Sequence, residues 1–395
     1  MSKALEGIRV IDLTTAYSGP FCTMHLADHG AEVIKVEYPG TGEQSRNWGP
    51  FKNGNSGYYN FLNRNKKGIT LNLKHEKGKK ILRELVQNAD VLVENFKVGM
   101  LNGLGLGYED LKKINPKLVY AAISGFGQNG PYASRPCYDI VAQAMSGVMT
   151  ITGFPGNPPT KIGPSVGDNY TGTYLTLGIM LALFYRERTG KGQMVDVSML
   201  DTLFSVLENA VITNTLTGEI PKQVGNADPS IAPFDVFATL DGYLAVGVGT
   251  DAQWERLCQV MNREDLVHDE RFNTNGKRVA NYEPDLKTIV SQWVSKHTRY
   301  EMEEMLVAAG ICVGPVLNVE EAVNHPQIRQ REMIVDFDTP ELGRISIPGV
   351  PIKLSVSPGE ISKAAPTLGE ENIELLSQLG YSTTDIEEMR KEGVI

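Results

Sequence analysis

Short apolar runs alternate with amphipathic segments over the first two hundred residues. The runs that predict strands are residues 8–13, 33–37, 69–73, 91–94, 118–124 and 194–198. Between the first two, Pro20 suits the first turn of a helix and Gly30 its end. Residues 77–87 have the spacing of an amphipathic helix. This alternation predicts a parallel, doubly wound α/β sheet that binds its ligand beyond the carboxyl ends of the strands.

The longest apolar segment, residues 170–185, follows Gly167 and Asp168. Threonines and glycines interrupt it, and it is shorter than the roughly 20 residues that a membrane span needs, so it predicts a buried helix. A carboxylate at the start of such a helix accepts backbone N–H groups, feels the positive end of the dipole and stays ionised. On local sequence alone, Asp168 fits both an ordinary helix cap and a functional carboxylate that faces a cleft.

The pattern changes near residue 220. Residues 221–233 are polar and rich in turn formers, and Asp241-Gly242 between two apolar runs predicts a hairpin. Helices are predicted near 201–216, 252–261, 285–296 and 299–309, and at 371–379 after a proline-rich stretch. Thr298 and Glu301 have the spacing of a capping box. We therefore predict a large domain in residues 1–220, a smaller α+β domain in 221–325 and a C-terminal segment, 326–395.

Composition bounds the possible functions. A chain of 395 residues with 41% hydrophobic and 22% charged residues is typical of a soluble two-domain protein. The net charge of −9 argues against a nucleic-acid partner. The four cysteines lack any C-x-x-C pair and the histidines are scattered, which argues against disulfides or a metal site and fits a reducing cytoplasm. The first residues carry no apolar signal run, so no secretory peptide is expected.

Basic residues concentrate locally between positions 64 and 80. They are Arg64, Lys66, Lys67, Lys74, Lys77, Lys79 and Lys80. Such a run fits either a solvated helix face or a local patch for a phosphorylated ligand, and both interpretations stay open. The turn after the first strand has only Gly19 in place of G-x-G-x-x-G, which disfavours a nicotinamide oxidoreductase.

Several segments, taken in order, resemble one known family over nearly the whole chain. They are LEGIRVID (5–12), GAEVIKVE (30–37), NKK (65–67), LNLK (71–74), VENF (93–96), SGFGQ (124–128), GD (167–168), GKGQ (190–193) and VDVS (195–198). In these segments the chain resembles the family III CoA-transferases, which include formyl-CoA:oxalate and carnitine CoA-transferases and the related 2-methylacyl-CoA racemases.

The resemblance implies a mechanism and a set of site residues. In that family a single aspartate attacks the acyl-CoA thioester and carries CoA as an aspartyl thioester, and Asp168 matches it. CoA is the substrate, and neither a metal nor a tightly bound cofactor is implied. The positions that match CoA contacts are Tyr17, Ser18, Tyr38, Leu71, Lys74, Asn95, Phe96, Lys97 and Tyr138.

The resemblance also implies an interlocked homodimer, with a Rossmann-like large domain to which residues 326–395 return, and together with the cysteine pattern we predict a cytoplasmic enzyme. The racemase branch has a histidine before an aspartate where this chain has Tyr138-Asp139. Racemisation needs two acid/base groups, so it is the disfavoured alternative, and a non-catalytic CoA-binding protein is another. Tyr17 replaces the glutamine of formyl-CoA:oxalate enzymes, and the region after 221 looks closer to acetyl-CoA:oxalate transferases. The expected acceptor is a small di- or hydroxy-carboxylic acid, whose identity stays open along with that of the acyl donor.

Overall fold

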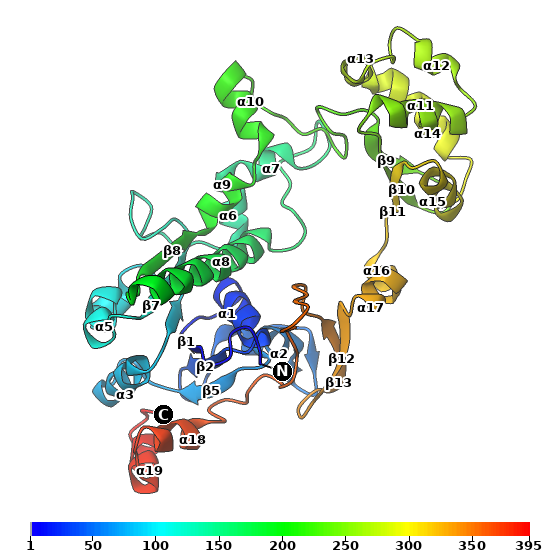
Figure 1. Cartoon of the computed structure of the whole chain (residues 1–395). Coiled ribbons are helices and arrows are strands. Elements are labelled where there is room, and N and C mark those ends of the chain that lie inside the picture. The colour runs from blue at the N-terminus through cyan, green and yellow to red at the C-terminus, as the bar shows by residue number, and fades with distance from the viewer. Residues whose placement is uncertain (1) are drawn as a thin grey trace. The chain divides into compact units, whose positions relative to one another are not determined.

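The computed structural model describes residues 2–395, which form two compact units (Figure 1). One unit contains the chain up to residue 148 together with 161–209 and 326–395. The other contains residues 149–160 and 210–325. The first unit therefore combines segments from both ends of the chain.

The first unit is built on a six-stranded parallel sheet. Its strands are β1 (Arg9–Asp12), β2 (Glu32–Glu37), β5 (Lys67–Thr70), β6 (Val91–Glu94), β7 (Val119–Ser124) and β8 (Met194–Ser198), in the order β5-β2-β1-β6-β7-β8. Every neighbouring pair is parallel. Counted along the chain, this order is 3-2-1-4-5-6, that of a doubly wound nucleotide-binding sheet. The predicted parallel α/β sheet is confirmed, and the order reverses between β1 and β6.

Helices cover both faces of this sheet (Figure 1). On one face α1 (Ser18–Asp28) and α8 (Val166–Thr189) pack over alternate strand residues such as Val10 and Val93. The other face is covered by α3 (Glu76–Gln87), α5 (Tyr108–Ile114), α18 (Asn372–Gln378) and α19 (Thr383–Lys391). Leu376 and Ile386 of the last two helices share one core with Ile11. The C-terminal segment thus completes the large core.

The first unit also contains several smaller elements. They are α2 (Gly57–Asn63), α4 (Met100–Gly103), α6 (Asp139–Ser146), α9 (Met199–Ser205), α17 (Pro326–Gln330) and the hairpins β3–β4 (Phe51–Lys52, Asn55–Ser56) and β12–β13 (Ile334–Thr339, Gly343–Pro348). The single helix predicted over 201–216 is wrong, because α9 ends at Ser205 and α10 (Asn209–Thr217) begins four residues later. Glu208 lies between them at φ 50°, a left-handed conformation that a helix does not contain.

The second unit has a three-stranded antiparallel sheet in the order β11-β10-β9. The strands are β9 (Phe234–Ala238), β10 (Tyr243–Gly247) and β11 (Cys312–Pro315), and the main helices are α11 (Asp251–Val260), α14 (Lys287–Val294) and α15 (Arg299–Ala308). The hairpin predicted at Asp241-Gly242 is confirmed, and so is the capping box of Thr298 and Glu301. Trp254 and Phe272 pack edge to face in its core.

Across residues 2–395, no helix has the length and apolar character needed to cross a membrane.

Candidate functional site

A cavity of about 580 Å³ lies where the strand order of the large sheet reverses. Its walls are the loops that follow β1, β6 and β7, together with residues 133–140, the tip of α2 and the start of α8. The predicted residues that line it are Tyr17, Ser18, Asn95, Phe96, Lys97, Tyr138 and Asp168. The fold therefore brings seven of the ten predicted residues into one place.

Asp168 lies in the first turn of α8, where the Ser18 side chain is near enough to its carboxylate to act as a hydrogen-bond donor. Burial, and then the negative charge of Asp139, raise the pKa of Asp168 to about 6, while the Ser18 bond opposes the rise. The burial of the carboxyl and the charge of Asp139 therefore outweigh the helix N-terminus, which we expected to favour the ionised form. A pKa near 6 still leaves most of the group ionised at neutral pH, as predicted.

Asp139, which sequence reasoning did not select, takes the role expected of Asp168 as a helix cap. Its buried carboxylate accepts the backbone N–H of Gly167 at 2.8 Å and Nε2 of Gln143 at 2.7 Å. A Cβ on Gly167 would lie 2.9 Å from Oδ1 of Asp139, so glycine is needed for this approach. The available sequence signal was an acidic residue at the start of a helix that follows a turn.

Tyr17 connects the loop after β1 to the start of α8. Its hydroxyl donates to Oδ1 of Asn169 at 2.7 Å, and its ring stacks on Phe21 at 5.4 Å between centroids. Burial and the charge of Asp168 raise the pKa of Tyr17 to about 12, so it remains a phenol donor at neutral pH. Trp48 and Tyr58, whose ring centroids are 5.7 Å apart, line the same cavity. The sequence analysis did not select them, because their short segment carries no motif.

The other three predicted residues lie around an adjacent cavity of about 160 Å³. Tyr38, Leu71 and Lys74 line it, and it shares Thr15 and Phe96 with the larger cavity. Tyr38 and Lys74 are exposed, whereas Leu71 is buried and forms part of the wall. The two cavities form neighbouring compartments along the carboxyl edge of the sheet.

The family model for CoA-transferase family III matches residues 5–372. The chain belongs to this family. It is 44% identical over 351 residues to the acetyl-CoA:oxalate CoA-transferase of Acetobacter aceti, which covers 89% of each chain. It is 37% identical over 395 residues to the succinyl-CoA:glutarate CoA-transferase of Homo sapiens, covering 100% of this chain and 90% of that one. A CaiB/BaiF family protein from Brucella suis has a similar fold, with a TM-score of 0.84, 37% identity and coverage of 96% and 100%.

In this family III CoA-transferase two residues of the basic run at 64–80 form buried ion pairs. Arg64 pairs with Asp28 at 2.7 Å and Lys66 with Asp12 at 3.0 Å, and both cations are buried. Both interpretations of the run as a surface feature are therefore wrong for these two residues. Lys74 is exposed and lines the smaller cavity.

Among residues 2–395, no group of three or more histidine, cysteine, aspartate or glutamate side chains is arranged to hold a metal ion. The four cysteines are free thiols. CoA thioesters are the substrates of the family.

Proposed function

We propose that this family III CoA-transferase moves CoA from an acyl-CoA donor to a small dicarboxylic acid through covalent intermediates on Asp168. The observation that carries the proposal is an ionised carboxylate in the wall of a large cavity, at the point where the sheet order reverses. The hydroxyl of Ser18 donates to this carboxylate, and Tyr17 is held beside it through Asn169.

The proposed reaction consists of four exchanges. The Asp168 carboxylate attacks the thioester carbonyl, the C–S bond breaks, and CoA leaves as a thiolate from an aspartyl–acyl anhydride. The thiolate attacks the aspartyl carbonyl and expels the donor acid, which leaves an aspartyl-CoA thioester. The acceptor carboxylate then expels the thiolate to form a second anhydride, and the thiolate attacks its acyl carbon and releases Asp168. Each step exchanges bonds of similar energy, so no nucleotide is consumed.

The two neighbouring cavities suit a long thioester. We infer that the acyl end of CoA lies beside Asp168 and the nucleotide end beside Tyr38 and Lys74, with Phe96 between them. The exposed ammonium groups of Lys74 and Lys97 can bind phosphate oxygens. The exposed rings of Tyr38 and Tyr138 can pack on the flat parts of the ligand. The hydroxyl of Ser18 can donate to the oxyanion of each tetrahedral intermediate.

The charges in the large cavity favour a dicarboxylic acceptor. Arg135 and Lys161 line the same cavity as Asp168. Lys161 already donates to the carbonyls of Ile162 and Gly163, at 2.7 Å each. The guanidinium of Arg135 lies over the ring of Tyr132, 3.6 Å from its centroid, and can receive a second carboxylate in a bidentate pair. The relatives named for oxalate and glutarate support this class of acceptor.

Replacing Arg135 by glutamine is expected to raise the KM for dicarboxylic acceptors by about 10–100-fold. Hydrogen bonds to a charged group contribute roughly 1.5–3 kcal/mol, and glutamine cannot form the paired bonds. The KM for acetate as acceptor and the KM for acyl-CoA should change little. Steady-state kinetics with succinate, oxalate and acetate would measure this, with Arg390→Gln on α19 as the matched control. An equal loss for acetate would show that Arg135 does not recognise the second carboxylate.

The covalent mechanism is tested by trapping. The protein is incubated with a panel of acyl-CoAs, quenched with hydroxylamine or borohydride, and digested for mass spectrometry. We expect modification of the peptide that contains Asp168, and the acyl-CoA that reacts identifies the donor. Samples without acyl-CoA give the background. Turnover without modification at Asp168 would contradict the proposal, and deuterium uptake at the α-carbon of a branched acyl-CoA would point to the racemase branch.

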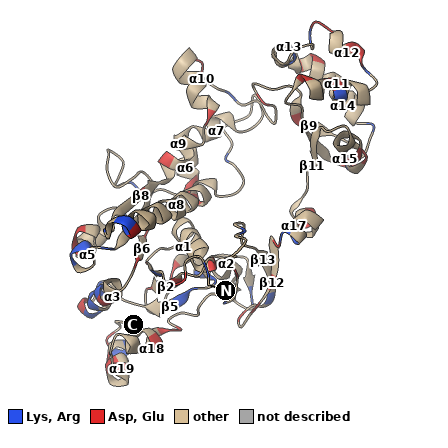
Figure 2. Cartoon of the chain, viewed as in Figure 1, with Lys and Arg blue, Asp and Glu red and all other residues tan. Residues whose placement is uncertain are grey.

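We further propose a homodimer in the cytoplasm, with no tightly bound cofactor. The side chains on α8 that remain exposed include Tyr170, Tyr174, Leu177, Leu181 and Phe184, spaced as one stripe, and Figure 2 shows this helix free of charged residues over most of its length. A second copy of the chain is the occupant that this face suits. The free cysteines fit a reducing compartment. We also propose that the chain divides into a large domain in residues 1–220, a smaller domain in 221–325 and a C-terminal segment, 326–395.

A further inference from the structure

The loop between β1 and α1 carries Tyr17 and leads into Ser18, the first residue of α1, and buried or half-buried side chains hold its backbone. Nζ of Lys35 donates to the carbonyl of Thr14 at 2.5 Å. The amide of Asn95 bonds both backbone groups of Thr15, at 2.9 and 2.8 Å. The backbone N–H of Ala16 donates to Oε2 of Glu43 at 3.1 Å. Because the loop lies outside the sheet ladder, these side chains supply the partners that a strand would supply.

Ala16 is the strained residue of this loop. Its φ is 69°, in the left-handed region that costs a non-glycine residue on the order of 1 kcal/mol or more. Such a conformation persists only where the surroundings enforce it. Since Ala16 directly precedes Tyr17 and Ser18, its conformation sets the direction in which those two side chains leave the loop.

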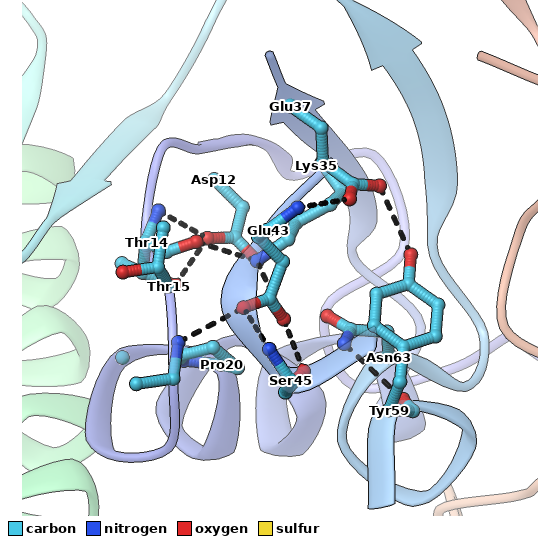
Figure 3. Close-up of polar contacts among 12 residues, drawn as sticks. Asp12, Thr14, Thr15, Pro20, Lys35, Glu37, Glu43, Ser45, Tyr59 and Asn63 are labelled. Atoms are coloured by element: carbon cyan, nitrogen blue, oxygen red, sulfur yellow. Dashed lines mark hydrogen bonds and ion pairs between the residues drawn. The ribbon is translucent and has the colours of Figure 1, made fainter. Parts of the chain in front are cut away.

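Glu43 is the group that bonds Ala16, and its carboxylate is almost completely buried. The same carboxylate accepts the backbone N–H of Ser45 at 2.9 Å and also the Ser45 hydroxyl. Nζ of Lys35 lies 4.0 Å from Oε1 of Glu43 and balances the charge of this carboxylate. Figure 3 shows Glu43 between the loop and Ser45, with Lys35 beside it. Glu43 contributes to the wall of the smaller cavity, and its side chain is only 2% exposed.

We propose that Glu43 is a positioning residue for the nucleophile: by bonding Ala16 it holds the strained turn that directs the Ser18 hydroxyl to Asp168 and the Tyr17 hydroxyl to Asn169. Glu43 acts through the loop rather than on the substrate. The inference rests on the proposed role of Asp168. Glu43, which lies outside the catalytic motif, would thus help to arrange the site.

Loss of the Glu43 bond should change the acid limb of the pH–rate profile. The Ser18 bond lowers the pKa of Asp168 against burial and Asp139, so a relaxed loop should let that pKa rise. The acid limb of kcat/KM would then move to higher pH. The titratable or charged groups that face Asp168 or line its cavity are Asp139, Tyr17, Tyr58, Tyr138, Cys137, Lys97, Arg135 and Lys161. Burial first, and then nearby negative charge, raise the pKa values of Tyr17, Tyr58 and Cys137, so none of these three titrates in the acid limb.

The test is Glu43→Gln, with kcat and KM measured from pH 5 to 9. We expect kcat to fall roughly tenfold or more, the KM for acyl-CoA to change little, and the acid limb to move up by as much as about one pH unit. Ala16→Gly in the same background should restore much of the loss, since glycine adopts a positive φ without strain. Ser18→Ala should move the limb equally, and adding Glu43→Gln to it should move it no further.

Glu371→Gln is the matched control, because this buried carboxylate also accepts a backbone N–H, that of Gly68 at 2.6 Å, away from the site. It should lower the melting temperature and leave the acid limb in place. If Glu43→Gln does the same, or if Ala16→Gly restores nothing, Glu43 is structural only and the inference is wrong. Should Glu43→Gln fail to fold, Glu43→Asp carries the same comparison. Retained turnover in Asp168→Ala would instead overturn the proposed function.

Discussion

Asp168→Ala is expected to lower kcat for CoA transfer by roughly 10³–10⁶-fold, the range seen when a covalent nucleophile is removed. Alanine cannot form the anhydride, and the remaining cavity can only bind the two substrates near each other. Because the smaller cavity is unchanged, the affinity for CoA, measured by calorimetry, should stay within a few-fold of wild type. Activity would be followed as the appearance of the new acyl-CoA.

A second variant, Asp168→Asn, distinguishes loss of the nucleophile from damage to the fold. The folded pKa of Asp168 is about 6 and that of an unfolded aspartate about 3.9, so the folded protein binds more protons between these values. Ionisation of Asp168 therefore lowers stability as the pH rises through that window. The asparagine variant should melt above wild type at pH 7, and the difference should vanish near pH 4. An inactive variant that melts lower at pH 7 would mean that the loss of turnover reflects damage to the fold.

The part of this site that could be predicted follows from strand order. The alternation of strand and helix segments predicts a parallel sheet. In such a sheet the loops after the first and fourth strands along the chain, β1 and β6, meet where the strand order reverses. Asn95 shows the result directly, since its side chain bonds both backbone groups of Thr15 across that point. The loops that carry the predicted residues were therefore accessible from the sequence pattern together with the family resemblance.

Other features could not be predicted, because they depend on partners that no local pattern identifies. Asp139 bonds the backbone of Gly167, 28 residues away, and Glu43 bonds that of Ala16, 27 residues away. A backbone N–H is present at almost every position, so sequence gives no sign of which one a carboxylate will reach. The raised pKa of Asp168 could not be predicted for the same reason, because the nearby charge of Asp139 depends on a contact between two helices.

Lys66 is the clearest example of a misleading local pattern. It sits in a basic run that looks exposed, yet it is fully buried, and its ammonium contacts Asp12 at 3.0 Å, Asn63 at 2.8 Å and the carbonyl of Pro20 at 3.2 Å. Burial lowers the pKa of Lys66 to about 8, despite the attraction of Asp12. Burial alone would raise the pKa of Asp12, but Lys35, Lys66 and two threonine hydroxyls hold it well below its usual range. The two residues keep each other charged in the interior.

Asp12→Ala is therefore expected to cost about 3–5 kcal/mol of unfolding free energy, since it leaves buried cations without their carboxylate. It also removes the acceptor for Thr23, at 2.7 Å, and for the backbone of Thr14, at 2.9 Å. Urea unfolding at pH 7 would measure the loss. The deficit should shrink as the pH rises, because without the attraction of Asp12 the pKa of Lys66 falls still lower in the folded variant, and the variant therefore gains stability with pH over a wider range than wild type does.

Two control variants test whether the buried pair of Asp12 and Lys66 stabilises the fold. Asp110→Ala removes an exposed partner of Lys113, 3.7 Å away, and should cost less than about 1 kcal/mol. Asp12→Leu combined with Lys66→Met removes both charges together and should recover a large part of the Asp12→Ala loss, because no ammonium is left without its carboxylate at that position. If the double variant were as unstable as Asp12→Ala, the threonine bonds rather than the charge on Lys66 would account for the cost. A loss in Asp12→Ala no larger than that in Asp110→Ala would refute the stabilising role of the pair.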